Sequence, residues 1–232
     1  MDNLFFCEPE HISEDRKQLI LTGQEAIHCS KVLRKRTGDR LSVADGAGSH
    51  YSCTITMSTK QQVFASIDEV ITHDLPDRKK VLALGSIKKR DRLEFAIEKA
   101  VELGATELCL FNSDHSERTR INEDRTRQQI ISAFKQSGRF WLPDLRVKDS
   151  LEEVLAEYAD LQAVMAHEKT KVQEPGFPAE SDLLLLVGPE GGFSPRETNL
   201  VESSGGMLIS LGANRLRAET AVTAILSLLL FR

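Results

Sequence analysis

Short segments of apolar residues alternate with polar turns over the first third of the chain. Three of them are rich in Val, Ile, Thr, Tyr and Phe, a composition typical of strands: 40–43, 51–57 and 62–70. Turn-forming residues separate these segments at 45–48 and 58–60, and a short helix is expected near 23–33. The pattern predicts a small β-barrel or sandwich that ends at the polar stretch 73–77.

From residue 80 onward, apolar strand-like segments alternate with stretches of helical periodicity. Strands are expected at 81–85, 107–111, 161–166, 183–187 and 207–211. Five consecutive apolar residues at 183–187 are typical of a central parallel strand that is buried on both faces. The alternation predicts an α/β domain with a parallel sheet, so we expect two domains, 1–74 and 75–232.

Helix-capping signals mark the ends of several expected helices. Asp91 with Glu94 and Ser194 with Glu197 have the spacing of a capping box. Gly104 is expected to close the helix 91–103, because glycine adopts the left-handed conformation without a steric penalty. Further helices are expected at 122–136, from 150 and at 218–230.

The charge distribution is uneven. The net charge of −5 argues mildly against a nucleic-acid-binding protein. Basic residues are nevertheless concentrated in three clusters, at 31–40, 78–92 and 118–127. One such cluster is more typical of a solvated face, whereas three in an acidic chain favour a surface that meets a polyanion.

Neither a metal site nor a membrane segment is expected. The four cysteines and six histidines form no CxxC or HExxH motif, so we expect reduced, mostly buried thiols. No apolar run approaches the roughly 20 residues that span a bilayer. The first ten residues lack the layout of a signal peptide, which predicts a cytoplasmic protein.

Two unusual loops follow expected strands, at 188–192 (GPEGG) and 212–217 (GANRLR). Neither has the spacing of a phosphate-binding P-loop or of a dinucleotide fingerprint. Each could be an ordinary turn between a strand and a helix. Ligands of open parallel sheets bind at the carboxyl ends of strands, so the pair of loops favours one shared small-molecule cleft.

These loops also carry a family resemblance. The segments LLLVGPEGGFS at 184–194, SLG at 210–212 and LRAETA at 216–221 are similar to the paired signature of the 16S ribosomal RNA uridine-N3 methyltransferases. The stretches HCSKVLR at 28–34 and EKAVELG at 98–104 also resemble this family. Similar segments run from about residue 4 to 230, so the resemblance covers nearly the whole chain.

The resemblance implies a PUA-like β-barrel followed by an α/β domain of the SPOUT class, whose C-terminal segments form a trefoil knot. It implies S-adenosyl-L-methionine (SAM) as cofactor, 16S rRNA or the small ribosomal subunit as substrate, and a homodimer. The cofactor site is expected to include Gly188, Pro189, Glu190, Gly191, Gly192, Leu211, Gly212, Leu216 and Arg217. Relatives often have LGPRILR where this chain has LGANRLR, which leaves the role of Arg215 open.

Catalytic candidates follow from the chemistry at N3 of uracil. The N3 proton must leave, and Arg217 could stabilise the negative charge on the carbonyl oxygens. Glu219 could be the base, or it could cap a helix and interact with the helix dipole. RNA contacts are expected from His28, Lys31, Arg34, Lys35 and Arg118, although His28 and Arg118 could also have purely structural roles.

Two other functions remain open from the sequence. The chain could be a SPOUT methyltransferase that acts on tRNA or another RNA. It could also be a non-catalytic RNA-binding factor for ribosome assembly, although the intact GPEGG and LRAETA segments argue against that. A Rossmann oxidoreductase is disfavoured by the spacing of the glycines.

Overall fold

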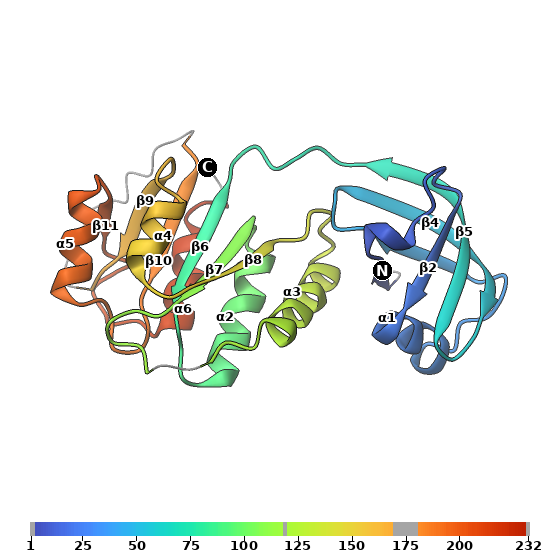
Figure 1. The fold of residues 1–232 in the computed structure, drawn as a ribbon, viewed down its shortest axis with the longest axis horizontal. Coiled ribbons are helices and arrows are strands. Elements are labelled where there is room, and N and C mark those ends of the chain that lie inside the picture. Colours follow the sequence, from blue (N-terminus) through green and yellow to red (C-terminus); the bar gives the residue numbers. More distant parts are fainter. Residues whose placement is uncertain (1–2, 118–119, 169–180, 231–232) are drawn as a thin grey trace. The chain divides into compact units, whose positions relative to one another are not determined.

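The computed structural model describes residues 3–117, 120–168 and 181–230, which form two compact units. The first unit comprises the described residues up to Leu75 together with Phe134–Leu142. The second comprises Pro76–Ala133 and the described residues from Pro143 onward. Both units are drawn in Figure 1. The fold class expected from the sequence, a small β-barrel-like unit and an α/β unit with a parallel sheet, is confirmed.

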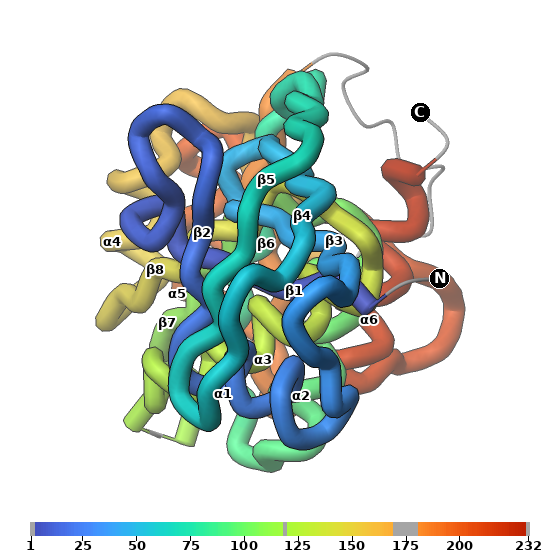
Figure 2. Tube along the Cα trace, turned by 90° about the vertical axis from the view of Figure 1, so that its right-hand side faces the viewer, coloured from blue at the N-terminus to red at the C-terminus, as the bar shows by residue number. Residues whose placement is uncertain are grey.

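The first unit is built on a five-stranded sheet in the order β1-β3-β4-β5-β2. The strands are β1 (Leu4–Phe6), β2 (Gln18–Thr22), β3 (Arg40–Ala44), β4 (Ser49–Ser58) and β5 (Gln62–Thr72). Figure 2 shows β2, β5 and β4 side by side. Every second side chain from Ser49 to Ile55 of β4 is buried, as expected for a sheet with one covered face.

The helix expected near 23–33 is divided in two. After a short 3-10 turn at Pro9–His11, α1 (Gly23–Ile27) leads into a π-helical turn at His28–Val32. In this turn the amide of Leu33 donates to the carbonyl oxygen of His28 at 2.9 Å, which is an i to i+5 bond.

The segment 134–142 is separated in sequence from the rest of the first unit but packs within it. Phe134 contacts the Phe6 ring edge to face at 6.0 Å, and Lys135 forms an ion pair with Glu25. The indole of Trp141 lies over Gly48, where an added Cβ would be 2.3 Å from the ring. Only glycine at position 48 therefore allows this contact.

The second unit has a six-stranded, fully parallel sheet in the order β11-β9-β10-β6-β7-β8. The strands are β6 (Lys80–Gly85), β7 (Glu107–Phe111), β8 (Asp144–Lys148), β9 (Gln162–Ala166), β10 (Leu183–Val187) and β11 (Met207–Ile209). All five residues of β10 are buried, which confirms the prediction of a central strand. The helices are α2 (Arg90–Glu102), α3 (Glu123–Ser137), α4 (Leu151–Glu157), α5 (Pro195–Ser203) and α6 (Ala218–Ser227).

Helices cover the sheet in two groups. One buried cluster joins alternate residues of the central strands to α4 and α5, through Leu151, Val154 and Val201. Helices α2 and α6 pack against each other, and α6 also packs against β10. This arrangement leaves the carboxyl ends of the strands open to the loops that follow them.

Several of the predicted helix ends are confirmed, including the start at Ser150, and one is wrong. Ser194 and Glu197 form both bonds of a capping box, Asn122 accepts a bond from the Arg125 amide at 3.0 Å, and Gly104 has a φ of +88°. Asp91, however, does not cap α2. The helix begins one residue earlier, and the carboxylate of Glu94 binds arginine side chains instead of the helix N-terminus.

The four cysteine thiols are buried, which leads to a first prediction. Burial raises the pKa of Cys7 and Cys53 to about 12 and that of Cys109 to about 11, and it also raises the pKa of Cys29. A thiol with a pKa near 12 is about 0.01% thiolate at pH 8, and the thiolate is the reactive form.

We expect iodoacetamide to leave all four thiols unlabelled in the native protein at pH 8, measured by mass spectrometry. The same protein in urea should be labelled four times. Fast labelling of any native cysteine would contradict this account.

Candidate active site

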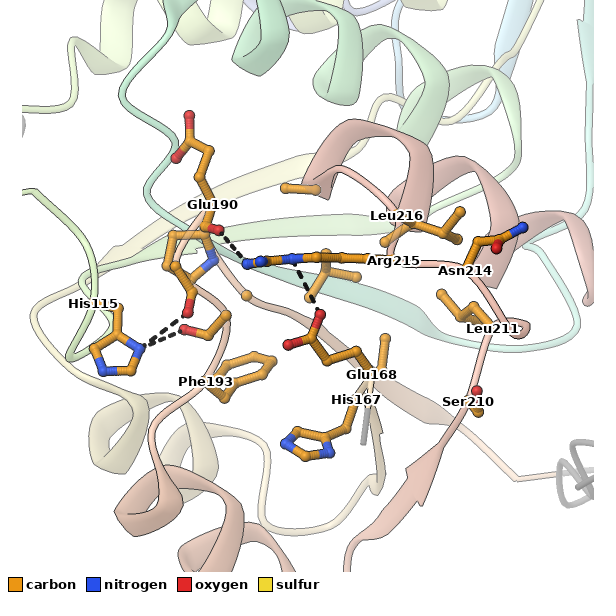
Figure 3. A pocket seen from close by; sticks show the side chains of 18 of the residues that line it. His115, His167, Glu168, Glu190, Phe193, Ser210, Leu211, Asn214, Arg215 and Leu216 are labelled. Carbon is orange, nitrogen blue, oxygen red and sulfur yellow. Dashed lines mark hydrogen bonds and ion pairs between the residues drawn. The ribbon is translucent and has the colours of Figure 1, made fainter. Parts of the chain in front are cut away.

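A pocket of about 200 Å³ lies at the carboxyl ends of β9, β10 and β11 (Figure 3). Its walls are the loop 188–193 after β10, the segment 210–216 after β11, and residues 166–168 after β9. Residues from the first turns of α5 and α6 complete it, with His115 from the loop after β7. Most of these walls are backbone, glycine or apolar side chains, which suits a small molecule that is held through backbone groups and apolar contacts.

The loop 188–193 is close-packed against the end of β6. An added Cβ at Gly85 would be 2.6 Å from Cδ of Pro189, and one at Gly188 would be 3.2 Å from the backbone of Gly192. A turn bond from the Gly192 amide to the Pro189 carbonyl oxygen, at 2.9 Å, folds the loop back on itself. Glycine is required at position 85, because Pro189 approaches its backbone more closely than a side chain allows, and the packing at Gly188 is tight enough to favour glycine.

The buried carboxylate of Glu197 joins this loop to the loop after β7. Its oxygens accept bonds from the Ser194 amide at 2.9 Å, the Asp114 amide at 3.1 Å and the Ser113 hydroxyl at 3.0 Å. The side chain of Glu197 is fully buried. A buried carboxylate is stable only when it is well hydrogen-bonded, and these three donors meet that requirement. Glu197 therefore fixes both loops in one arrangement.

His115 was not among the residues predicted from the sequence. Its Nδ1 lies 3.2 Å from the carbonyl oxygens of both Gly191 and Gly192. Carbonyl oxygens only accept hydrogen bonds, so Nδ1 carries the proton. An added Cβ at Gly191 would be 2.8 Å from Cβ of His115. His115 thus closes one side of the pocket, and no sequence motif marks it.

Arg215 crosses the pocket in Figure 3. Its Nε lies 3.1 Å from Oε2 of Glu168, and its Nη2 donates to the carbonyl oxygen of Glu190 at 3.3 Å. Glu168 was not predicted either, because only the sheet order brings the end of β9 beside the 212–217 loop. Both charged side chains are about half exposed or more, so the ion pair contributes little to stability and can open for a ligand.

The structure brings most of the expected cofactor residues into the pocket lining: Gly188, Pro189, Glu190, Gly191, Gly192, Leu211, Gly212 and Leu216. Arg217 does not line it. This arginine is the N-cap residue of α6, and its side chain is exposed to solvent.

Glu219, the other catalytic candidate, lies in the first turn of α6. Its Oε1 is 3.7 Å from Nε of Arg92 on α2, and its side chain is 12% exposed. The other oxygen, Oε2, is buried and has no hydrogen-bond partner among the described residues. A carboxylate at this position interacts favourably with the dipole of α6. The role of Glu219 as a catalytic base stays a prediction.

The residues expected to contact RNA lie mostly in the first unit. His28, Lys31 and Arg34 have exposed side chains on and after the π-helical turn. The side chain of Lys35 donates to the carbonyl oxygen of Arg40 at 2.6 Å. Arg118 lies outside the described residues.

The described part of the chain has neither a cluster of metal-binding side chains nor a membrane-spanning helix. No group of three or more His, Cys, Asp or Glu side chains could hold a metal ion in residues 3–117, 120–168 and 181–230. Among those residues, no helix has both the length and the apolar character needed to cross a bilayer.

Comparison with known proteins gives matches over nearly the whole chain. Residues 75–230 match the RNA methyltransferase domain family, and 21–68 match the RNA methyltransferase PUA domain family. Ribosomal RNA small subunit methyltransferase E from Mycobacterium bovis is 30% identical, over 89% of this chain and 84% of that protein.

Solved structures agree with these matches. A probable rRNA methyltransferase from Porphyromonas gingivalis is 32% identical, with a TM-score of 0.83 over 98% of this chain and 96% of that one. Ribosomal RNA small subunit methyltransferase E from Neisseria gonorrhoeae, solved with bound S-adenosyl methionine, is 26% identical. Its TM-score is 0.84, over 99% of this chain and 97% of that one.

Proposed function

The chain belongs to the ribosomal RNA small subunit methyltransferase E family, and on that premise we propose that it methylates N3 of a specific uridine in 16S rRNA. It is a SAM-dependent RNA methyltransferase with a PUA-like barrel and a SPOUT α/β domain that ends in a trefoil knot. We further propose the small ribosomal subunit as the substrate particle and a cytoplasmic homodimer as the acting form.

One observation carries the proposal: the two loops with the family signature form the walls of a single pocket. Gly188 and Gly191 allow this loop to pack closely, since an added Cβ would be 3.2 Å from the backbone of Gly192 and 2.8 Å from Cβ of His115, respectively. Leu211 and Leu216 provide apolar surface, and the backbone of both loops offers groups that can bind an adenine ring. These residues fit SAM, whose sulfonium centre supplies an activated methyl group when it is bound.

The protein's task in this reaction is mainly to position the two reactants. N3 lies on the Watson–Crick edge of uridine, so the base must be unpaired before the methyl group can reach it. The side chain of Arg217 forms no hydrogen bond or ion pair with another described residue, which leaves its guanidinium available to the uracil oxygens. The proton on N3 must leave, and Glu219 is the candidate acceptor only if its contact with Arg92 breaks.

RNA binding is proposed for both parts of the chain. The first unit, expected at 1–74, would bind RNA through contacts to phosphate groups from His28, Lys31, Arg34 and Lys35. Arg118 is proposed to contact RNA from the catalytic domain, expected at 75–232. Such contacts position the substrate without reading its sequence.

The test is mass mapping of 16S rRNA from cells that lack this protein, followed by treatment of their 30S subunits with purified protein and SAM. We expect one uridine without its methyl group in the deletion strain, and a methyl group restored at N3 in vitro. Arg217→Ala should slow the transfer by about 100-fold, as expected when a stabiliser of negative charge is removed. If 16S rRNA from the deletion strain carries the same methyl groups as wild-type rRNA while the protein still binds SAM, 16S rRNA is rejected as the substrate and tRNA becomes the candidate. If the wild-type protein does not bind SAM, this result would support the alternative of a non-catalytic RNA-binding factor.

A further inference from the structure

A second cavity, of about 190 Å³, lies in the α/β unit between the first turns of α2 and α3. Apolar side chains form part of its lining: Ile87, Leu93, Ile97 and Ile121. Its other lining residues include four cations and a single carboxylate: Lys88, Arg90, Arg120, Arg125 and Glu94. An apolar surface inside a ring of cations suits a ligand with a flat apolar part and a negative charge.

The charges come from two basic clusters that are far apart in the sequence. Lys88 and Arg90 belong to the cluster 78–92, whereas Arg120 and Arg125 belong to the cluster 118–127. The fold brings members of both to one cavity, since β6 and β7 are neighbours and α2 and α3 follow them. This convergence is what a polyanion-binding surface requires, and sequence order alone does not provide it.

Glu94 holds two of the arginines in place. Its Oε1 accepts from Nε of Arg90 at 2.9 Å, and from Nε and Nη2 of Arg125 at 3.0 and 2.7 Å. Each guanidinium has five N–H donors, so most of the ten remain available for an oxyanion. Arg120 is exposed and makes no ion pair with another described residue. The three arginines are therefore partly preorganised and in excess over their one carboxylate, whereas Lys88 is paired with Glu117 at 2.5 Å.

The cavity lies next to the cofactor pocket. The amide of Lys88, which lines the second cavity, lies 3.4 Å from Oε2 of Glu190, which lines the first. This contact links the loop after β6, which lines the second cavity, to the loop after β10, which lines the first. One hydrogen bond therefore connects the lining of the second cavity with the lining of the cofactor pocket.

We propose that this cavity binds an unpaired nucleotide of the RNA substrate that neighbours the target uridine. The base packs on the apolar residues, and the adjoining phosphate lies among Arg90, Arg120 and Arg125. The inference rests on the proposed function, because the target uridine must leave its base pair and its neighbours are then exposed. Arginine is suited to this task, since its planar group can meet phosphate oxygens with two parallel bonds.

The test compares the double variant Arg120→Gln, Arg125→Gln with the wild type. Filter binding with labelled 16S rRNA should show a dissociation constant raised at least about tenfold, and a salt dependence less steep by about 1.4 for two lost single-strand phosphate contacts. SAM binding, measured by calorimetry, should be unchanged. Arg127→Gln is the matched control, because Arg127 lies on the same helix without lining the cavity, and it should alter RNA affinity less than twofold.

Cross-linking locates the base. RNA with 4-thiouridine in place of uridine should cross-link to peptides that contain 87–97 or 120–129 of the wild type. Wild-type RNA affinity in the double variant, or cross-links confined to the first unit, would overturn the proposal. A change from dimer to monomer with unchanged RNA affinity would also overturn it, because the cavity would then be a subunit interface. If the wild type neither binds 16S rRNA nor methylates 30S subunits, the proposed function itself fails.

Discussion

Glu197→Ala is expected to lower the free energy of unfolding by about 3–5 kcal/mol, because it leaves buried donors without an acceptor. Glu197 accepts three hydrogen bonds from two loops, and its side chain is fully buried. The substitution also removes the capping box of α5. At about 2–4 °C per kcal/mol for a chain of this size, the melting temperature should fall by at least roughly 6 °C. SAM binding should weaken at the same time, since the cofactor loop loses its anchor.

Two further variants show whether the effect is local. Glu202→Ala removes an exposed carboxylate from the same helix and should leave the melting temperature within about 1 °C. Glu197→Gln keeps the shape and one acceptor oxygen, so its effect should be intermediate. Hydrogen exchange should accelerate most at the amides of Asp114 and Ser194. A Glu197→Ala protein that melts and binds SAM like the wild type would show that the two loops hold their arrangement without this carboxylate.

Gly85→Ala is expected to weaken SAM binding at least about tenfold and to cost about 1–3 kcal/mol of stability, the usual range for overpacking. Gly85 ends β6, and an added Cβ would be 2.6 Å from Cδ and 2.9 Å from N of Pro189. Real Cβ atoms do not approach other atoms this closely, so the cofactor loop must move away from the strand. Calorimetry with SAM measures the effect, and thermal melting shows that the protein still folds.

The matched control is Gly23→Ala. Gly23 has a φ of +55°, and an added methyl group there meets no atom within 4 Å. The Gly23→Ala substitution should lower the free energy of unfolding by about 1–2 kcal/mol, because alanine is strained in the left-handed conformation. It should leave SAM affinity unchanged, because Gly23 lies in the first unit. Equal SAM affinities for Gly85→Ala and the wild type would show that the loop tolerates the displacement.

The elements that the sequence predicted well are those whose signal is local. The strand 183–187 was predicted with the bounds that the structure shows, because five apolar residues in a row need burial on both faces. The capping box at Ser194 was also correct, since its partners are three residues apart. Strand β8 was missed. It lies at the edge of the sheet, and its polar residues Asp144, Arg146 and Lys148 hide the apolar pattern of a strand.

The sequence by itself determined the fold class and the two glycine-rich loops, because hydrophobic periodicity and glycine spacing act over a few residues. The family followed from the resemblance of the motifs in these loops to those of known methyltransferases. Only the tertiary structure placed His115 and Glu168 in the pocket. Only the tertiary structure joined two basic clusters around one cavity. These neighbours are set by the strand order β11-β9-β10-β6-β7-β8, in which residues distant along the chain meet at one edge of the sheet. Such pairings arise from the packing of the whole sheet, which no local pattern encodes.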